Sequence, residues 1–201
     1  MATTHASIER NIKRHKRGEL VFPKDFRGKG SDSAIKKTLS RLNKEGTIKR
    51  LAHGIYVFPE TDPLFGEILP SAETVAESIA KREHVRIKPA GANALHKLGL
   101  STQVPTKLVY LTDGTAREIK LGKNVIRFKA TTPKKLSLKG KLSGLIIQAL
   151  EELGTKNIDP QTEKRLSDLL KKEDFKALQH DLKLATGQIH DYLLKLYNAN
   201  D

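Results

Sequence analysis

Residues 31–58 read SDSAIKKTLSRLNKEGTIKRLAHGIYVF, and this stretch decides the fold expected for the first part of the chain. Ser31 or Asp32 can cap a helix that ends before Gly46, because short polar side chains accept the first free N–H groups and glycine favours the conformation that closes a helix. The runs 47–51 and 55–58 are rich in β-branched and aromatic residues and meet at Gly54. The stretch therefore predicts a helix followed by a β-hairpin.

The residues before this stretch predict two more helices. Thr3 or Thr4 can cap a first helix that runs to about Arg17, and residues 20–22 suit only a short bridging strand. Pro23 favours the first turn of a short second helix, and residues 27–30 form a flexible basic turn. The order helix, helix, helix, strand, strand is that of a winged helix-turn-helix, in which the third helix enters the major groove and the hairpin reaches an adjacent groove or the backbone.

The third predicted helix has one apolar side and one cationic side. Ile35, Leu39 and Leu42 lie on the apolar side at helical spacing. A cationic helix face is often merely solvated, but its place in the predicted order favours contact with DNA. The residues predicted to contact DNA are Lys24, Arg27, Ser31, Ser33, Lys36, Lys37, Ser40, Arg41, Lys44, Lys49, Arg50 and His53.

The composition also points to a polyanionic partner. The 201 residues include 37 Lys and Arg against 23 Asp and Glu, which gives a net charge of +14. The chain has no cysteine, which excludes disulfides and thiolate metal sites and fits a reducing compartment. No stretch approaches the roughly 18 apolar residues of a membrane span. We therefore expect a cytoplasmic protein without a membrane partner.

The positive charge is concentrated in two zones. Residues 1–60 carry 14 Lys and Arg against 6 Asp and Glu, and residues 117–141 carry 9 against 1. Between them, residues 61–116 are neutral, with 6 of each sign. Prolines and a glycine interrupt the hydrophobic periodicity from Pro59 to Pro70. We therefore predict a DNA-binding domain over residues 1–60 and a second domain over residues 61–201.

The second part predicts a mixture of helices and strands. Ser71 and Thr74 can start a helix, residues 92–98 suit a short one, and residues 85–88 suit a strand. The runs 107–111, 117–121 and 125–129 predict a small antiparallel sheet, and the last sixty residues have helical spacing. The expected fold class is α+β: a winged helix-turn-helix, then a mixed α/β domain with a small antiparallel sheet and a helical C-terminal tail.

A second basic surface is predicted in this sheet. In a strand, residues two apart share a face, so Arg127 and Lys129 project together. This surface can extend a DNA footprint, bind RNA, oppose an acidic protein surface or be simply solvated. Its predicted members are Arg117, Lys120, Lys123, Arg127 and Lys129.

Motifs of enzymes are missing from the sequence. The seven histidines include no pair at the i, i+4 spacing that places two metal ligands on one helix face, and the glycines form no phosphate-binding loop. No serine lies in a nucleophile elbow. We therefore expect no catalytic residues, no metal and no cofactor. One enzymatic alternative stays open, a site of dispersed Asp and Glu residues that assembles only in the fold.

Two stretches of the chain resemble a known family. The first is RLAHGIYVFP at residues 50–59, where Gly54, Tyr56 and Pro59 match a Gly-x-Tyr-x-x-Pro wing signature. The second comprises NAL at 93–95, LGLSTQVP at 98–105 and YLTDG at 110–114. Together they resemble the AbiEi-type antitoxin family of bacterial type IV toxin-antitoxin and abortive-infection systems. The resemblance covers roughly residues 5–130, and it implies that the second domain, residues 61–201, is an antitoxin-like α+β domain with C-terminal helices.

The resemblance implies a winged-helix autorepressor that binds inverted repeats upstream of its own operon, as a monomer or dimer on double-stranded DNA. Its functional counterpart would be a nucleotidyltransferase-like toxin, with no stable complex required. One alternative is a basic RNA-binding or translation-associated protein, and another is an antitoxin that acts through protein contacts with DNA binding secondary. The cationic helix face has no aromatic residue on which bases of single-stranded RNA could stack, which favours duplex DNA.

Overall fold

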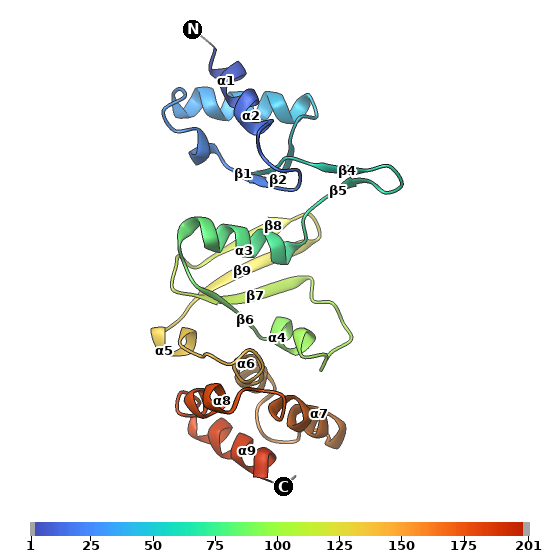
Figure 1. The fold of residues 1–201 in the computed structure, drawn as a ribbon, viewed down its shortest axis with the longest axis vertical. Coiled ribbons are helices and arrows are strands. Elements are labelled where there is room, and N and C mark those ends of the chain that lie inside the picture. The colour runs from blue at the N-terminus through green and yellow to red at the C-terminus, as the bar shows by residue number, and fades with distance from the viewer. Residues whose placement is uncertain (1–2, 199–201) are drawn as a thin grey trace. The chain divides into compact units, whose positions relative to one another are not determined.

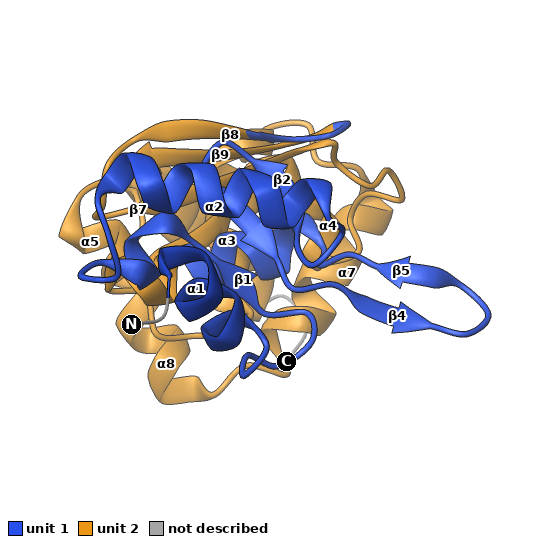
Figure 2. Cartoon of the chain, turned by 90° about the horizontal axis from the view of Figure 1, so that it is seen from above, with its two compact units in different colours: residues 1–79, 120–123 blue, residues 80–119, 124–201 orange. Residues whose placement is uncertain are grey.

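The structure, a computed structural model, describes residues 3–198 and has an α+β fold in two compact units (Figure 2). Unit 1 comprises residues 1–79 and 120–123, and unit 2 comprises residues 80–119 and 124–201. The domain boundary predicted after Glu60 falls inside unit 1, which continues to Ile79. In the described residues, no helix combines the length and the apolar character needed to cross a bilayer.

Unit 1 begins with helices that pack on a three-stranded antiparallel sheet of order β1-β3-β2. Its core is a cluster of buried side chains that includes Ile8, Phe26, Leu39 and Ile48. The first elements are, in chain order, α1 (Thr4–Ile12), β1 (Leu20–Val21), the 3₁₀ helix η1 (Pro23–Phe26), α2 (Asp32–Lys44), β2 (Lys49–Ala52) and β3 (Ile55–Val57).

The local signals read from the sequence start these helices as predicted. The Thr3 hydroxyl accepts a hydrogen bond from the Ala6 N–H at 3.2 Å, and the Ser31 hydroxyl accepts one from Ala34 at 3.3 Å. The prediction that α1 reaches Arg17 is wrong. Beyond Ile12 the backbone turns away, and the Gly18 N–H donates to the Phe58 carbonyl at 2.7 Å, which ties the chain to the sheet.

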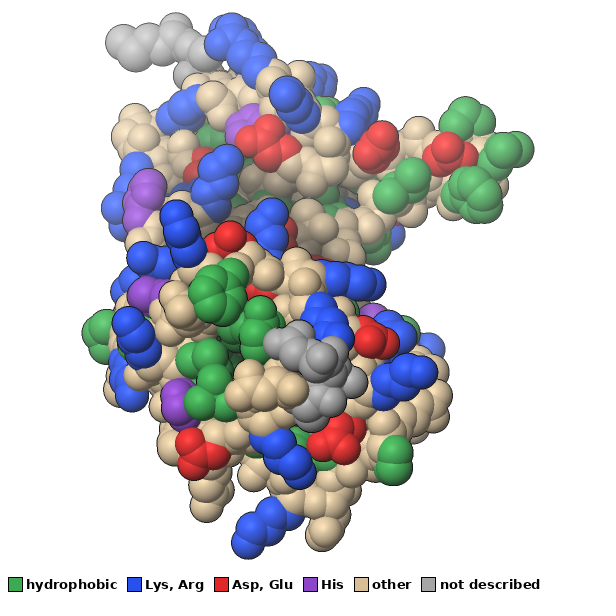
Figure 3. Space-filling model, turned by 60° about the horizontal axis from the view of Figure 1, so that its bottom comes forward, with side chains coloured by type: hydrophobic (Ala, Val, Ile, Leu, Met, Phe, Trp, Pro, Cys, Tyr) green, Lys and Arg blue, Asp and Glu red, His purple; other side chains and the backbone are tan. Residues whose placement is uncertain are grey.

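A second hairpin follows the first sheet, at the residues in which the sequence predicted only an interruption. It consists of β4 (Glu60–Asp62) and β5 (Gly66–Ile68), and Figure 2 shows it extending away from the helices of unit 1. The Asp62 carboxylate accepts the N–H groups of Leu64 and Phe65 at 2.8 and 3.0 Å, which shapes the turn. Of the prolines and the glycine in this stretch, Pro63 and Gly66 therefore lie at the tip of a hairpin, where exposed hydrophobic side chains gather (Figure 3).

Unit 2 combines a four-stranded sheet with a helical C-terminal part (Figure 1). Helix α3 begins within unit 1 and ends within unit 2, and strand β8 begins within unit 2 and ends within unit 1. The elements are, in chain order, α3 (Ala72–Glu83), β6 (Ile87–Ala90), α4 (Ala92–Lys97), β7 (Lys107–Thr112), β8 (Arg117–Leu121), β9 (Asn124–Ala130), α5 (Pro133–Leu136), α6 (Ser143–Leu153), α7 (Pro160–Leu170), α8 (Phe175–Leu182) and α9 (Gly187–Asn198).

The four-stranded sheet corrects the prediction of a purely antiparallel one. Its strand order is β6-β7-β9-β8, and β7 runs parallel to β9, with Val109 opposite Arg127 and Leu111 opposite Lys129. The central strands are the ones that bury apolar side chains, such as Tyr110 on β7. Strand β8 buries no residue and lies at the edge. Because β9 buries apolar side chains and β8 does not, β9 rather than β8 takes the central position beside β7.

The helical C-terminal part packs around one apolar cluster, in which Ile146 and Leu150 of α6 meet residues of α4, α7, α8 and α9. This confirms the predicted helices. Beside this cluster, the buried Asp181 carboxylate accepts the N–H groups of Lys139 and Gly140 at 2.7 and 2.9 Å and the Ser143 hydroxyl at 2.7 Å. A buried carboxylate with three such donors fixes the turn before α6.

The same surroundings set the ionisation of Asp181. Burial raises the pKa of its carboxyl group, but the hydrogen bonds from His180, Lys139, Ser143 and Gly140 together outweigh burial and lower the pKa below its ordinary value. Asp181 therefore stabilises unit 2 as an anion.

Candidate nucleic-acid interface

Helix α2 separates an apolar side from a cationic side, as its sequence predicts. Ile35, Leu39 and Leu42 are buried in the core of unit 1. The opposite side is exposed, and in the described part of the chain no carboxylate forms an ion pair with Lys37 or Arg41. These cations are therefore available to a partner. The exposed residues of this side are Lys36, Lys37, Ser40, Arg41 and Lys44.

A hollow of about 270 Å³ lies between α2, η1 and the β2–β3 hairpin of unit 1. We call it the α2–hairpin groove. It brings Lys36 and Ser40 of α2 together with Arg50 and His53 of the hairpin, which are distant in sequence. Its full lining is Pro23, Lys36, Ser40, Asn43, Arg50, His53, Gly54 and Tyr56.

Hydrogen bonds hold the hairpin side of this groove in place. The Arg50 N–H donates to the side-chain oxygen of Asn43 at 2.7 Å, which ties β2 to α2. The Arg50 guanidinium donates to the Ala52 carbonyl at 3.3 Å and lies 3.3 Å from the His53 ring nitrogen Nδ1. The two polar side chains at the hairpin tip are therefore positioned together.

Two residues of the wing signature, Gly54 and Tyr56, shape the hairpin. Gly54 has a φ of +69°, a conformation that residues with a side chain rarely adopt. Tyr56 is only 7% exposed and belongs to the core cluster of unit 1. A register shift between Arg50 and Ala52 accompanies the turn.

All twelve side chains predicted to contact DNA are exposed, but they do not all converge. Lys36, Ser40, Arg50 and His53 meet at the α2–hairpin groove, whereas the others lie elsewhere on the surface of unit 1. Lys49 forms an ion pair with Glu67 of β5, and the Ser31 hydroxyl is already used in capping α2. The Lys49 and Ser31 side chains are therefore less available for contact with DNA than the other ten.

The second basic surface is divided by the structure. Arg127 and Lys129 face one side of the sheet together with Val109 and Leu111. Arg117 instead places its guanidinium 5.3 Å from the ring centre of Phe128, a buried residue that alternates with Arg127 and Lys129 along β9. Alternation along a strand puts Arg117 on the opposite face from the other two.

Several cations of this region are neutralised by carboxylates. Glu118 lies 2.9 Å from the Lys107 ammonium and 3.5 Å from the Arg127 guanidinium. Arg117 donates to Glu83 at 2.7 Å. Lys120 and Lys123 are exposed near the turn that joins β8 to β9. The predicted members of the second basic surface thus differ in how far a neighbouring carboxylate neutralises their positive charge.

Sequence reasoning missed the residues whose role depends on tertiary contacts. Asn43 anchors the hairpin, and Lys107 belongs to the basic side of the sheet, but neither stands in a recognisable motif. Lys107 begins a strand that the sequence predicts, but only the parallel pairing of that strand with β9, which the sequence did not predict, brings it to this side of the sheet. Among residues 3–198, no group of three His, Asp or Glu side chains is arranged to hold a metal ion.

Comparison with known proteins places the chain in a family. Residues 7–178 match the model described as "Family of unknown function (DUF6088)", and the protein belongs to this family. The match covers most of both units. A search of curated proteins gave no match.

Proposed function

We propose that the protein is a DNA-binding antitoxin that represses its own operon. In this proposal, unit 1 acts as a winged helix-turn-helix whose helix α2 enters the major groove of double-stranded DNA. The observation that carries the proposal is the exposed, unpaired cationic side of α2 beside the α2–hairpin groove.

The chemistry of this surface suits a duplex. Lys and Arg side chains on an exposed helix donate to phosphates and to guanine edges, and Ser40 can donate or accept at a base edge. In this proposal, Arg50 and His53, whose side chains lie 3.3 Å apart at the hairpin, contact the neighbouring DNA backbone. The surface residues of α2 include no aromatic side chain, which disfavours the base stacking typical of single-stranded RNA recognition.

The antitoxin half of the proposal rests on the resemblance to AbiEi-type antitoxins. The counterpart is a nucleotidyltransferase-like toxin encoded nearby, which the antitoxin opposes without a stable complex. Co-expression of the protein with such a toxin measures this half. We expect normal growth with the wild type and loss of protection with Arg127→Glu and Lys129→Glu, while repression of an operator reporter persists. Parallel loss of both outputs in a folded variant contradicts the division of roles.

A mobility-shift assay with the protein's own upstream DNA, at two salt concentrations, tests the DNA half. We expect binding to this duplex about 10³-fold tighter or more than to a scrambled duplex, with affinity that falls as salt rises. Equal affinity for both duplexes, or tighter binding to single-stranded RNA, contradicts the proposal.

A further inference from the structure

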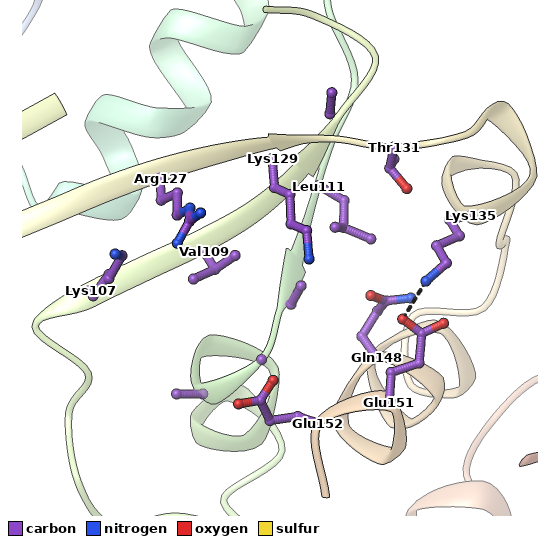
Figure 4. A pocket seen from close by; sticks show the side chains of 14 residues that line it. Lys107, Val109, Leu111, Arg127, Lys129, Thr131, Lys135, Gln148, Glu151 and Glu152 are labelled. Carbon is purple, nitrogen blue, oxygen red and sulfur yellow. Dashed lines mark hydrogen bonds and ion pairs between the residues drawn. The ribbon is translucent and has the colours of Figure 1, made fainter. Parts of the chain in front are cut away.

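Unit 2 contains a cavity of about 440 Å³ between its sheet and α6 (Figure 4). Figure 4 shows Arg127 and Lys129 reaching into it from β9, and Gln148 and Glu152 reaching into it from α6. All of its lining residues belong to unit 2. The volume lies within the range of about 300–1,000 Å³ that is typical of small-molecule pockets.

The parallel pairing of β7 and β9 builds the sheet side of this cavity. Val109 stands opposite Arg127 and Leu111 stands opposite Lys129, and all four line the cavity. Apolar side chains of β7 therefore lie beside cations of β9. Such a wall offers an apolar surface for a ring and positive charge for an anionic group.

Not all the charges of the cavity are neutralised within the protein. Lys135 pairs with Glu151 at 2.6 Å, and Arg127 lies 3.5 Å from Glu118. In the described part of the chain, neither Lys129 nor Glu152 has an ion-pair partner. The cavity thus presents one free ammonium and one free carboxylate.

One buried donor of the cavity is left unpaired by the protein. Gln148 is only 2% exposed and lines the cavity, yet its side-chain Nε2 has no hydrogen-bond partner in the described part of the chain. Leaving a buried donor unpaired costs about 1–3 kcal/mol, so most buried donors in proteins have an acceptor. A ligand that carries an acceptor would satisfy it.

We propose that this cavity binds a free mononucleotide whose base carries an exocyclic amine. The phosphate pairs with Lys129, with Arg127 beside it, and the base lies against Val109 and Leu111. Gln148 donates to an acceptor of the ligand. Glu152 accepts from the exocyclic amine, which adenine, cytosine and guanine have and uracil lacks. The site does not depend on the DNA binding proposed for unit 1.

Isothermal titration calorimetry on the full chain, with AMP, CMP and UMP as ligands, tests this site. We expect AMP and CMP to bind, and UMP, adenosine and inorganic phosphate to bind at least tenfold more weakly. Equal affinity for phosphate alone means that the site holds only an adventitious ion and overturns the proposal. A short single-stranded oligonucleotide that binds tenfold tighter than every mononucleotide overturns the assignment to a free ligand.

Three variants locate the binding. Lys129→Met is expected to weaken AMP binding at least tenfold, whereas the matched control Lys134→Met, on an exposed residue outside the cavity, leaves it unchanged. Glu152→Gln is expected to reduce the preference for CMP over UMP. Gln148→Leu is expected to weaken binding tenfold with equal or higher thermal stability, because it removes an unpaired buried donor. Unchanged affinity in both Lys129→Met and Gln148→Leu overturns the proposal.

Discussion

The two basic regions of the chain have similar charge in the sequence and different surroundings in the structure. On α2, Lys37 and Arg41 are exposed and have no carboxylate partner in the described residues. In the sheet of unit 2, Arg117 pairs with Glu83, and Arg127 lies beside Glu118. Net charge along a sequence therefore overstates how much charge a folded surface offers. The α2 side is the better candidate for a large polyanion, and the sheet side suits a small ligand.

The largest expected effect on DNA binding comes from α2. Lys37→Ala combined with Arg41→Ala removes two unpaired cations, and each lost base contact costs about 1–3 kcal/mol, so operator affinity is expected to fall by about 30-fold or more. Thermal stability should change little, since substitutions at exposed sites shift it by about 0.5 kcal/mol at most. Fluorescence anisotropy with labelled operator DNA measures the loss.

The control for this variant is Lys172→Ala with Lys176→Ala, which removes the same charge from exposed positions of unit 2. It should lose only the small, nonspecific part of the affinity. An equal loss in both double variants would mean that net charge, rather than α2, carries binding.

A second effect concerns a charge that acts within the fold. Asp181→Ala leaves the Lys139 and Gly140 N–H groups and the Ser143 hydroxyl without their acceptor, at about 1–3 kcal/mol each, so unfolding free energy should fall by about 3 kcal/mol or more. Asp174→Ala in the same helical part removes only an exposed helix cap and should cost about 1 kcal/mol. Urea denaturation compares the two. Equal costs would show that the buried carboxylate does not fix this turn.

The pKa of Asp181 gives the same region a pH dependence. Because folding lowers this pKa, the anion's contribution is complete above the ordinary Asp value of about 4 and is lost as pH falls through the folded-state pKa. We expect the wild type to lose more stability than Asp181→Asn between pH 5 and pH 2, as followed by thermal unfolding. Identical acid profiles would contradict the assignment.

A smaller effect is expected at the hairpin turn. Gly54→Val places a β-branched residue at a φ of +69°, which costs about 1–2 kcal/mol although the space beside Gly54 is open. Gly54→Asn should cost less, because asparagine tolerates this conformation. Thermal unfolding of both variants separates backbone strain from crowding, since crowding would penalise asparagine as well.

The smallest expected effect distinguishes the two contacts within the interface. Arg50→Ala removes one cation at the hairpin, so affinity should fall about equally for all duplexes and the salt slope should decrease by roughly 1. Titrations of operator and scrambled DNA at several salt concentrations measure this. A changed base preference at one operator position would instead make Arg50 a reader of sequence.

The sequence predicts those features that depend on a few neighbouring residues. Ser31 caps α2 and Gly54 turns the hairpin, because both requirements are local. The parallel pairing of β7 with β9 was missed, since it depends on which strands bury their side chains. The same pairing creates the cavity, so no pattern in the sequence predicts the surroundings of Lys129 and Gln148.

Because the chain has no cysteine, a single cysteine can be introduced at a chosen position. A reagent attached there tests whether α2 enters the major groove. Ser40→Cys, on the exposed side of α2 at the groove, carries an attached iron chelate that cleaves nearby DNA, and Lys176→Cys in unit 2 carries the same reagent as a control. We predict cleavage of both operator strands, centred on one major-groove segment of each half-site, from position 40 and none from position 176. Cleavage from position 176 alone, or none from position 40 under conditions in which the labelled protein binds the operator, would contradict the role of α2.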